Sequence, residues 1–325
     1  MLNYLFKRIF YAFPILVSVN VLTFFLFFVV NTPDDMARLH LGNKHVTQEA
    51  IDSWKADRGY NKPLFWASNA TGMKKITGTI FFENSLKLFL FQFGQSDSGR
   101  DISYDISQRM WPSLAIAVPI LIIGVCITLT IALFVAFFRA TYIDSTGVLI
   151  CVIMMSISGL FYIIGGQYLI GKMLKLVPIS GYSGGISSVK FLLLPVAVGV
   201  ISGLGNGTRW YRTIFLEEVN KDYVRTARSK GFKESYIMFS HVLRNALIPI
   251  MTGVVVVLPS LFLGSLITES FFGIPGLGSY TIEAIRAQDF AIVRSMVFLG
   301  SLLYILGLIL TDISYTLVDP RVRLN

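Results

Sequence analysis

The sequence is dominated by long apolar runs that contain no charged side chain. A run of about 20 apolar residues is long enough to cross the hydrocarbon core of a membrane as an α-helix. Two of the runs are short and need a few flanking residues to reach that length. The runs cover residues 9–33, 110–138, 145–171, 191–208, 245–268 and 295–311.

The composition agrees with a membrane protein. Of the 325 residues, 54% are hydrophobic and only 14% are charged, whereas an ordinary soluble domain has about 25% charged residues. This excludes a soluble enzyme, a disordered chain and a secreted disulfide-rich scaffold. We therefore predict an all-α polytopic membrane protein with about six transmembrane helices and a long extracytoplasmic loop after the first helix.

The basic residues predict the orientation of the chain. Its formal net charge is +9, and membrane proteins concentrate Lys and Arg in short cytoplasmic loops. With the N-terminus inside, the short cytoplasmic segments carry thirteen Lys and Arg and the short outer loops carry five. We expect both termini to be cytoplasmic and no nucleic acid to be bound. The predicted division is 1–33 for the first helix, 34–109 for the outer loop, and 110–325 for a five-helix core.

The outer loop holds one ambiguous stretch, residues 76–93. It is rich in apolar residues but contains Glu83 and Lys87, whose cost in a membrane offsets the gain from the apolar side chains. Because a Glu and a Lys four residues apart can pair on a helix, we predict an amphipathic helix on or near the membrane. Aromatic residues elsewhere in the loop are expected to pack against the membrane face; they are Trp54, Tyr60, Phe65, Trp66 and Tyr104.

The basic stretch 209–245 is the most informative loop. Apolar residues recur there every four positions, which predicts one stripe of an amphipathic helix; they are Phe215, Val219, Tyr223 and Ala227. Gly231 follows a basic last turn, where a helix commonly ends, and a second helix over 233–247 leads to Pro249, which opens the next span. A solvated connector is one interpretation. The other is a docking element whose exposed stripe, with the small Ala227 and Ser229, admits another protein closely.

Residues 222–231 (DYVRTARSKG) resemble the cytoplasmic EAA loop of bacterial ABC-importer permeases. The chain is similar in particular to the B-type subunit of the dipeptide, oligopeptide and nickel branch. Further matching stretches are 5–8 (LFKR), 93–96 (FGQS), 177–181 (VPISG), 241–249 (HVLRNALIP), 267–278 (ITESFFGIPGLG) and 319–323 (DPRVR). Residues 31–35 differ from the Pro-Gly-Asp-Pro run of many relatives, which leaves the subfamily open.

The resemblance implies a type I ABC-importer permease fold and a function without catalysis by this chain. The expected partners are a second homologous permease subunit, two cytoplasmic ABC ATPases, an extracytoplasmic substrate-binding protein and membrane lipid. No cofactor is expected on this chain, since ATP and Mg²⁺ would bind the ATPases. Peptides are the expected substrate, and nickel or another small solute is the alternative.

The resemblance also implies site residues. Those expected to couple the chain to an ATPase are Glu218, Asp222, Tyr223, Arg225, Thr226, Ala227, Arg228 and Gly231. Those expected at the pathway or its mouth are Glu269, Phe271, Pro275, Gly276 and Gly278. Glu269 and Asp312 border predicted spans, so either a functional role or simple solvation at the interface is open.

Other patterns favour ordinary structural roles. Gly199, Gly203 and Gly207 share one helix face, which favours close helix packing over a role in the pore. Residues 166–173 resemble a phosphate-binding loop but lack its final Ser or Thr, and His40 and His45 have no cluster of further metal ligands. An autonomous secondary carrier or an intramembrane enzyme is the rival class; it leaves the basic loop unexplained, and no paired catalytic groups lie within the predicted spans.

Overall fold

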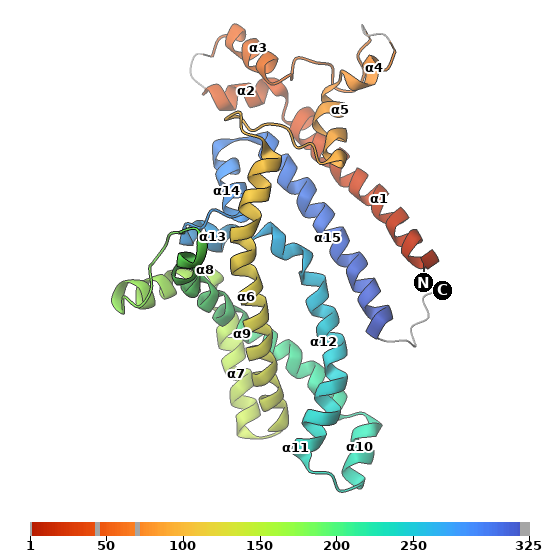
Figure 1. Cartoon of the computed structure of the whole chain (residues 1–325), viewed down its shortest axis with the longest axis vertical. Coiled ribbons are helices and arrows are strands. Elements are labelled where there is room, and N and C mark those ends of the chain that lie inside the picture. Colours follow the sequence, from red (N-terminus) through yellow and green to blue (C-terminus); the bar gives the residue numbers. More distant parts are fainter. Residues whose placement is uncertain (1, 43–45, 69–71, 319–325) are drawn as a thin grey trace. The chain divides into compact units, whose positions relative to one another are not determined.

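The computed structural model describes residues 2–42, 46–68 and 72–318, and every regular element in these ranges is helical (Figure 1). The predicted all-α membrane class is therefore confirmed. Within the described residues, five helices are long and apolar enough to cross a membrane, and a bent pair makes a sixth candidate. The five are Phe10–Val30, Ile102–Phe137, Val189–Val219, Glu234–Leu263 and Phe290–Ser314. The motif at 319–323 lies outside the described residues.

The sixth candidate is broken where a single span was predicted. Helix α7 (Tyr142–Ser156) and α8 (Gly159–Gly166), which continues as η3 (Gln167–Met173), meet at an angle of 87°. Ile157 and Ser158 adopt extended backbone between them. Ser and Gly are poor helix formers, so the chain turns at this point.

Two other predicted spans have different boundaries in the structure: one ends later than predicted and the other begins earlier. Helix α9 (Val189–Val219) continues well beyond residue 208, because its polar end is paired: the Arg212 guanidinium donates to both Asp144 carboxylate oxygens of α7 at 2.7 and 2.8 Å. Helix α12 (Leu243–Val257) contains Pro249 rather than beginning there. It follows α11 (Glu234–Tyr236) and a wider π turn, η5 (Ile237–Val242).

The fifth predicted span also stops early. The helix ends in η6 (Pro259–Leu263) at Gly264, and a separate short helix, α13 (Leu266–Phe272), follows. Gly264 has a φ of +71°, in the region that favours glycine. The prediction of one helix over 245–268 was therefore wrong at its C-terminal end.

Within the described residues the chain forms two compact units, whose boundaries fall inside α6 (Ile102–Phe137), α14 (Leu277–Ala287) and α15 (Phe290–Val318). Unit 1 comprises Met1–Arg109 and Tyr280–Leu306, and unit 2 comprises Met110–Ser279 and Gly307–Asn325.

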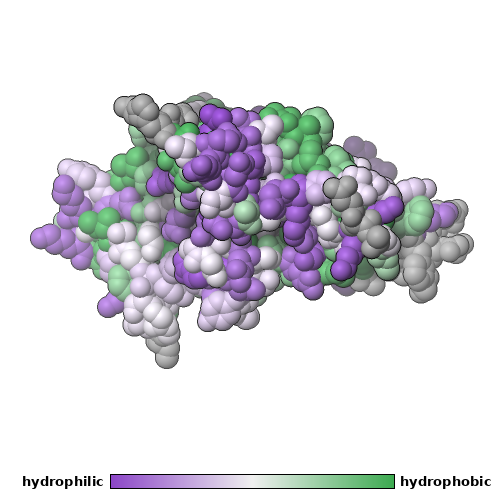
Figure 2. Space-filling view, turned by 90° about the horizontal axis from the view of Figure 1, so that it is seen from above, coloured by the Kyte–Doolittle hydropathy of each residue, from purple (hydrophilic) through white to green (hydrophobic). Residues whose placement is uncertain are grey.

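Unit 1 folds the predicted outer loop around the end of the first helix. Its helices are α1 (Leu2–Phe25) with η1 (Leu26–Val30), α2 (Pro33–Leu41), α3 (Gln48–Asp57), α4 (Lys74–Thr77), α5 (Ile80–Asn84) and η2 (Leu86–Leu90). A core containing Phe24, Phe28, Met36, Ile51 and Trp54 holds them together. Seen from above, hydrophilic side chains dominate the end that carries α2 and α3 (Figure 2).

The predicted amphipathic helix over 76–93 is wrong. Three short elements, α4, α5 and η2, occupy this stretch. The Glu83 carboxylate accepts from Lys62 at 2.7 Å instead of pairing with Lys87. A partner from outside the segment thus replaces the local pair on which the prediction was based. Of the loop aromatics, Trp54 and Tyr60 are buried in unit 1, whereas Phe65, Trp66 and Tyr104 are exposed.

In unit 2, small residues let α9 approach its neighbours. A Cβ on Gly199 would lie 2.5 Å from the Ile120 side chain of α6, and one on Gly207 would lie 2.9 Å from Thr128. A Cβ on Gly203, between them, would have no atom of the described residues within 4 Å. Gly205 faces α7, where a Cβ would come within 2.8 Å of the Cys151 carbonyl oxygen. Close helix packing therefore explains Gly199 and Gly207 but not Gly203.

We predict that Gly205→Ala destabilises unit 2, because the new methyl group meets backbone that cannot rotate away. Overpacking of this kind costs about 1–3 kcal/mol. Gly203→Ala on the same helix is the matched control: its methyl group has open space, and Ala favours a helix over Gly by about 1 kcal/mol. Thermal unfolding of both variants in detergent checks this. Equal melting temperatures would contradict the assigned α7–α9 contact.

Candidate functional site

The end of unit 2 formed by α10 (Asp222–Ser229) and α11 is a helical hairpin projecting beyond α9 and α12 (Figure 1). The chain enters it through a polar turn. The buried Glu218 carboxylate accepts from Lys221 Nζ at 2.6 Å and from Tyr223 Oη at 2.9 Å. Burial, together with the Glu218 carboxylate, raises the pKa of Tyr223, so its hydroxyl remains a donor. These bonds fix the direction in which α10 leaves α9.

The apolar stripe of this segment faces the protein. Val224 is fully buried and Ala227 is only 5% exposed. Both belong to a core with residues of α6, α9 and η5, including Ala132, Ala136, Phe215, Val219, Ile237 and Met238. The expectation of an exposed stripe was therefore wrong. A periodic apolar stripe indicates that a helix has a covered face, but it does not reveal which partner covers it.

The opposite face of α10 is open. Asp222, Arg225, Thr226 and Ser229 are exposed, and their polar side chains cannot fill a core. Gly231 has a φ of +80°, and a Cβ on it would meet no atom of the described chain within 4 Å. It therefore ends α10 by its backbone conformation, as the sequence predicted.

Three charged side chains close the hairpin. Arg228 donates to the Glu234 carboxylate at 2.8 and 3.1 Å, and Arg139 from the α6–α7 turn donates to the same group at 3.3 Å. Pairing with Glu234 raises the pKa of Arg228. Residues far apart in the sequence thus hold α10, α11 and the end of α6 together.

An exposed group of aromatic residues, which we call the aromatic tip, was missed by the sequence analysis. It consists of Phe232, Tyr236 and Phe239, all exposed. The Phe232 and Tyr236 rings lie 5.3 Å apart, and the Tyr236 ring lies 5.7 Å from that of His241. Phe232 precedes α11, Tyr236 ends it and Phe239 lies in η5. The recurrence of aromatic residues at intervals of four and three positions was the signal available in the sequence.

A second set of predicted residues surrounds Glu269 of α13. Its side chain is buried, with 1% exposure for the residue. The carboxylate accepts from the N–H groups of Ser265 at 3.1 Å and Ser279 at 3.0 Å, and also from the Gly278 N–H and the Ser113 hydroxyl. Burial raises the pKa of Glu269, and these donors oppose the rise. Simple solvation at the interface is thereby excluded for Glu269.

Glycines make this arrangement possible. A Cβ on Gly264 or Gly276 would overlap the Glu269 carboxylate and the Ser113 hydroxyl. One on Gly278 would lie within 2.6 to 2.7 Å of the Ser265 and Leu266 backbone. We call Glu269, Ser113 and these glycines the Glu269 cradle. Its predicted neighbours Phe271 and Pro275 are exposed.

The Glu269 cradle borders a cavity of about 370 Å³ within unit 2. Its lining is mainly apolar and comes from α6, α9, α12, η6 and α13, and it includes Ile116, Ile120, Leu121, Gly199, Val257, Leu261 and Thr268. Such a lining accepts varied side chains and offers few groups that would select one.

Comparison with known proteins identifies the class. The profile of the family described as binding-protein-dependent transport system inner membrane component matches residues 128–324, and that of its N-terminal region matches residues 1–84. The chain belongs to this family. It is therefore a multi-span permease subunit of a bacterial binding-protein-dependent transporter, a class that works with ATPase and substrate-binding components.

Several curated proteins are similar along the chain. A Brucella abortus protein named for a peptide transport system permease is 28% identical over 98% of both chains. The glutathione transport system permease protein GsiC of Pectobacterium atrosepticum is 29% identical over 99% of both. The oligopeptide transport system permease protein AppB of Bacillus subtilis is 37% identical over 42% of this chain and 43% of its own.

The structure also bears on the two other candidate sites, the loop at 166–173 and the pair of histidines. Residues 166–173 lie in α8 and η3, not after a strand. His40 lies 3.7 Å from Asp97, while His45 lies outside the described residues, among which no group of three or more metal-binding side chains occurs.

For the Glu269 cradle, we predict that Gly276→Ala lowers the free energy of unfolding of the purified chain by about 1–3 kcal/mol, because the new methyl group displaces the buried carboxylate from its donors. Gly253→Ala in α12 is the control, since a Cβ there would have no atom of the described residues within 4 Å. If both variants have the same melting temperature as the unaltered protein, the cradle is not packed as described.

For the hairpin, we predict that Ala227→Glu and Thr226→Glu behave differently although they are adjacent. Ala227→Glu places an unpaired carboxylate in the core that α10 shares with α6, α9 and η5. Such a buried charge lowers the free energy of unfolding by about 3–5 kcal/mol. Thr226→Glu places the carboxylate on the exposed face. Limited proteolysis of the 209–245 segment should detect opening of the hairpin only in Ala227→Glu, and equal protection of the two variants would overturn the assigned orientation of α10.

Proposed function

We propose that the chain is a permease subunit of an ATP-driven importer for peptides. The most direct support comes from the similar proteins. Besides the match to the family, relatives that align over nearly the whole chain are named for peptide or glutathione transport. The mainly apolar cavity beside the Glu269 cradle suits a substrate class with varied side chains. Substrate selection would then rest chiefly on the binding protein that delivers the peptide.

The proposed assembly contains this chain, a second homologous permease, two ABC ATPases and an extracytoplasmic binding protein. The chain itself performs no catalysis, and ATP and Mg²⁺ bind the ATPases. The hairpin and both termini are cytoplasmic, and residues 34–109 are extracytoplasmic, in agreement with the distribution of Lys and Arg.

The ATPase docks on the exposed face of the hairpin. The proposed docking surface consists of the aromatic tip and of the exposed Asp222, Arg225 and Thr226 of α10. Exposed aromatic side chains beside charged ones are typical of residues that contribute strongly to protein interfaces. Glu218, Tyr223, Ala227 and Arg228 support this surface from beneath, because their contacts lie within unit 2.

Movement of the docked hairpin is transmitted as a rigid body. Its buried face shares one core with α6, α9 and η5, and Glu234 links it to the α6–α7 turn. A packed core of this kind cannot deform continuously. A displacement imposed by ATPase closure therefore moves the ends of α6, α9 and α12 together.

The test uses the chain reconstituted in liposomes with its partner subunits and binding protein. We expect ATP-dependent uptake of a labelled tripeptide. Tyr236→Ala should weaken association with the ATPases at least about fivefold and reduce uptake correspondingly. Tyr168→Ala is the matched control, since Tyr168 is 52% exposed, against 51% for Tyr236, but lies in η3 away from the hairpin.

Association is measured by co-purification with the tagged chain, and folding by thermal unfolding. Uptake that needs neither ATP nor the ATPases would contradict the importer mechanism. Normal association of a folded Tyr236→Ala variant would instead contradict only the docking surface.

A further inference from the structure

Unit 1 contains a cavity of about 440 Å³ that none of the preceding functions uses. Its volume is within the range of about 300–1,000 Å³ typical of ligand pockets. The walls come from the end of α3, from α5 and η2, from the turn at 92–99 and from the start of α15. The charged residues that line it are Asp57, Arg58, Glu83, Asp97 and Arg294.

Arg294 is the most buried charged residue of this lining, with 4% exposure. Its Nη2 donates to the Asn84 side-chain oxygen at 2.9 Å, and the guanidinium carbon lies 4.9 Å from the centre of the Phe28 ring. Its Nε and Nη1 are buried and have no hydrogen-bond partner among the described residues. A buried guanidinium in this state is costly, because its lost hydration is not replaced.

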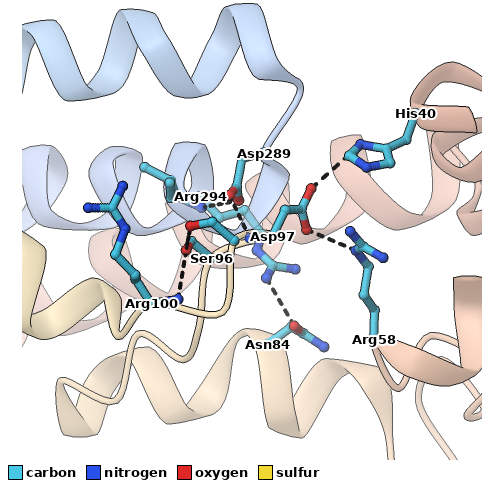
Figure 3. Close-up of polar contacts among 10 residues, drawn as sticks. His40, Arg58, Asn84, Ser96, Asp97, Arg100, Asp289 and Arg294 are labelled. Carbon is cyan, nitrogen blue, oxygen red and sulfur yellow. Dashed lines mark hydrogen bonds and ion pairs between the residues drawn. The ribbon is translucent and has the colours of Figure 1, made fainter.

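Three carboxylates at or beside the cavity, those of Glu83, Asp97 and Asp289, are engaged with other groups, and Figure 3 shows the contacts of Asp97 and Asp289. Asp97 accepts from Arg58 Nε at 2.8 Å and lies 3.7 Å from His40. Asp289 accepts from the Asp97 N–H at 2.7 Å and the Ile292 N–H at 3.2 Å. Since Glu83 is paired with Lys62, Arg294 is left with donors but no anion from these neighbours.

The lining also limits which anion fits. It contains three carboxylates and two guanidinium groups, a balance that disfavours a phosphate dianion. After the Asp97–Arg58 and Glu83–Lys62 pairs are formed, Arg294 and the exposed Asp57 remain as opposite charges on one lining. Opposite charges suit a ligand with one carboxylate and one ammonium group.

We infer that this cavity binds a small zwitterion, a free peptide or amino acid, whose carboxylate is held by Arg294. The ammonium end faces the side of the cavity that carries Asp57. Arg suits the first role because its planar fork matches a carboxylate geometrically. The inference rests on the proposed function only in taking peptides as the natural ligands; it adds a recognition site for the ends of the peptide on the permease itself.

The first experiment changes the ligand and leaves the protein unaltered. Binding of trialanine and of its C-terminal amide to the purified full chain is measured by calorimetry in detergent. We expect the free acid to bind about tenfold or more tightly than the amide, as for loss of a charge-assisted hydrogen bond. N-acetylation should weaken binding as well. Equal binding of acid and amide, or no binding of trialanine, would overturn the inference.

The second experiment changes the protein. Arg294→Gln should abolish the preference for the free acid, whereas Arg100→Gln, which alters the net charge equally but lies outside the cavity lining, should keep it. Thermal unfolding shows whether each variant is folded. A folded Arg294→Gln variant that retains the preference would overturn the inference. Displacement of bound trialanine by glycerol 3-phosphate but not by acetate would also overturn it, in favour of a phosphate site.

Transport separates this inference from the proposed function. ATP-dependent uptake of trialanine and its amide at equal rates, together with equal binding, would leave the importer intact and remove the site in unit 1. If the complete assembly takes up no peptide but the chain still binds the free acid preferentially, the site in unit 1 stands and the importer function is contradicted.

Discussion

The structure depends on the requirement that backbone N–H and C=O groups be paired wherever water is excluded. An unpaired group costs several kcal/mol in hydrocarbon, so a chain of this composition must cross as helices and can leave the helical form only where protein supplies the missing partners. The Glu269 cradle meets this requirement. The buried Glu269 carboxylate accepts from the N–H of Ser265, which precedes α13, and from those of Gly278 and Ser279 in the first turn of α14, where a helix leaves its N–H groups unpaired.

The same requirement explains why glycine and glutamate occur together there. The donors can converge on one carboxylate only if the backbone segments approach closely, and side chains at Gly264, Gly276 or Gly278 would block that approach. The buried charge is a cost that its four donors offset in part. The result is a fixed break in a helical unit beside its apolar cavity.

At the other end of unit 2, rigidity comes from packing and from charge pairs. The hairpin buries its apolar stripe against α6, α9 and η5 and presents polar and aromatic side chains outward. Under the proposed function, the outward face contacts the ATPase while the buried face moves the helices. In unit 1, by contrast, charges organise a cavity, and the Asp97–Arg58 and Glu83–Lys62 pairs leave the buried Arg294 without a carboxylate partner.

Much of this protein was determined by local sequence. The apolar runs dictated a helical membrane protein, and Gly231 marked the end of α10 because only glycine adopts its backbone conformation without strain. The sequence motifs, above all that at 222–231, predicted the family to which the chain belongs. These features depend on the residues themselves or on near neighbours in the chain.

Tertiary structure alone decided which partner each residue has. Glu83 pairs with Lys62 rather than the local Lys87, and the stripe containing Ala227 is covered by the protein's own core. Glu269, at the end of an apolar run, is buried because residues as distant as Ser113 fold around it. Periodicity shows that a face must be covered and charge shows that a group must be paired. Only the packed chain supplies the cover and the pair, because the contacts join residues far apart in the sequence.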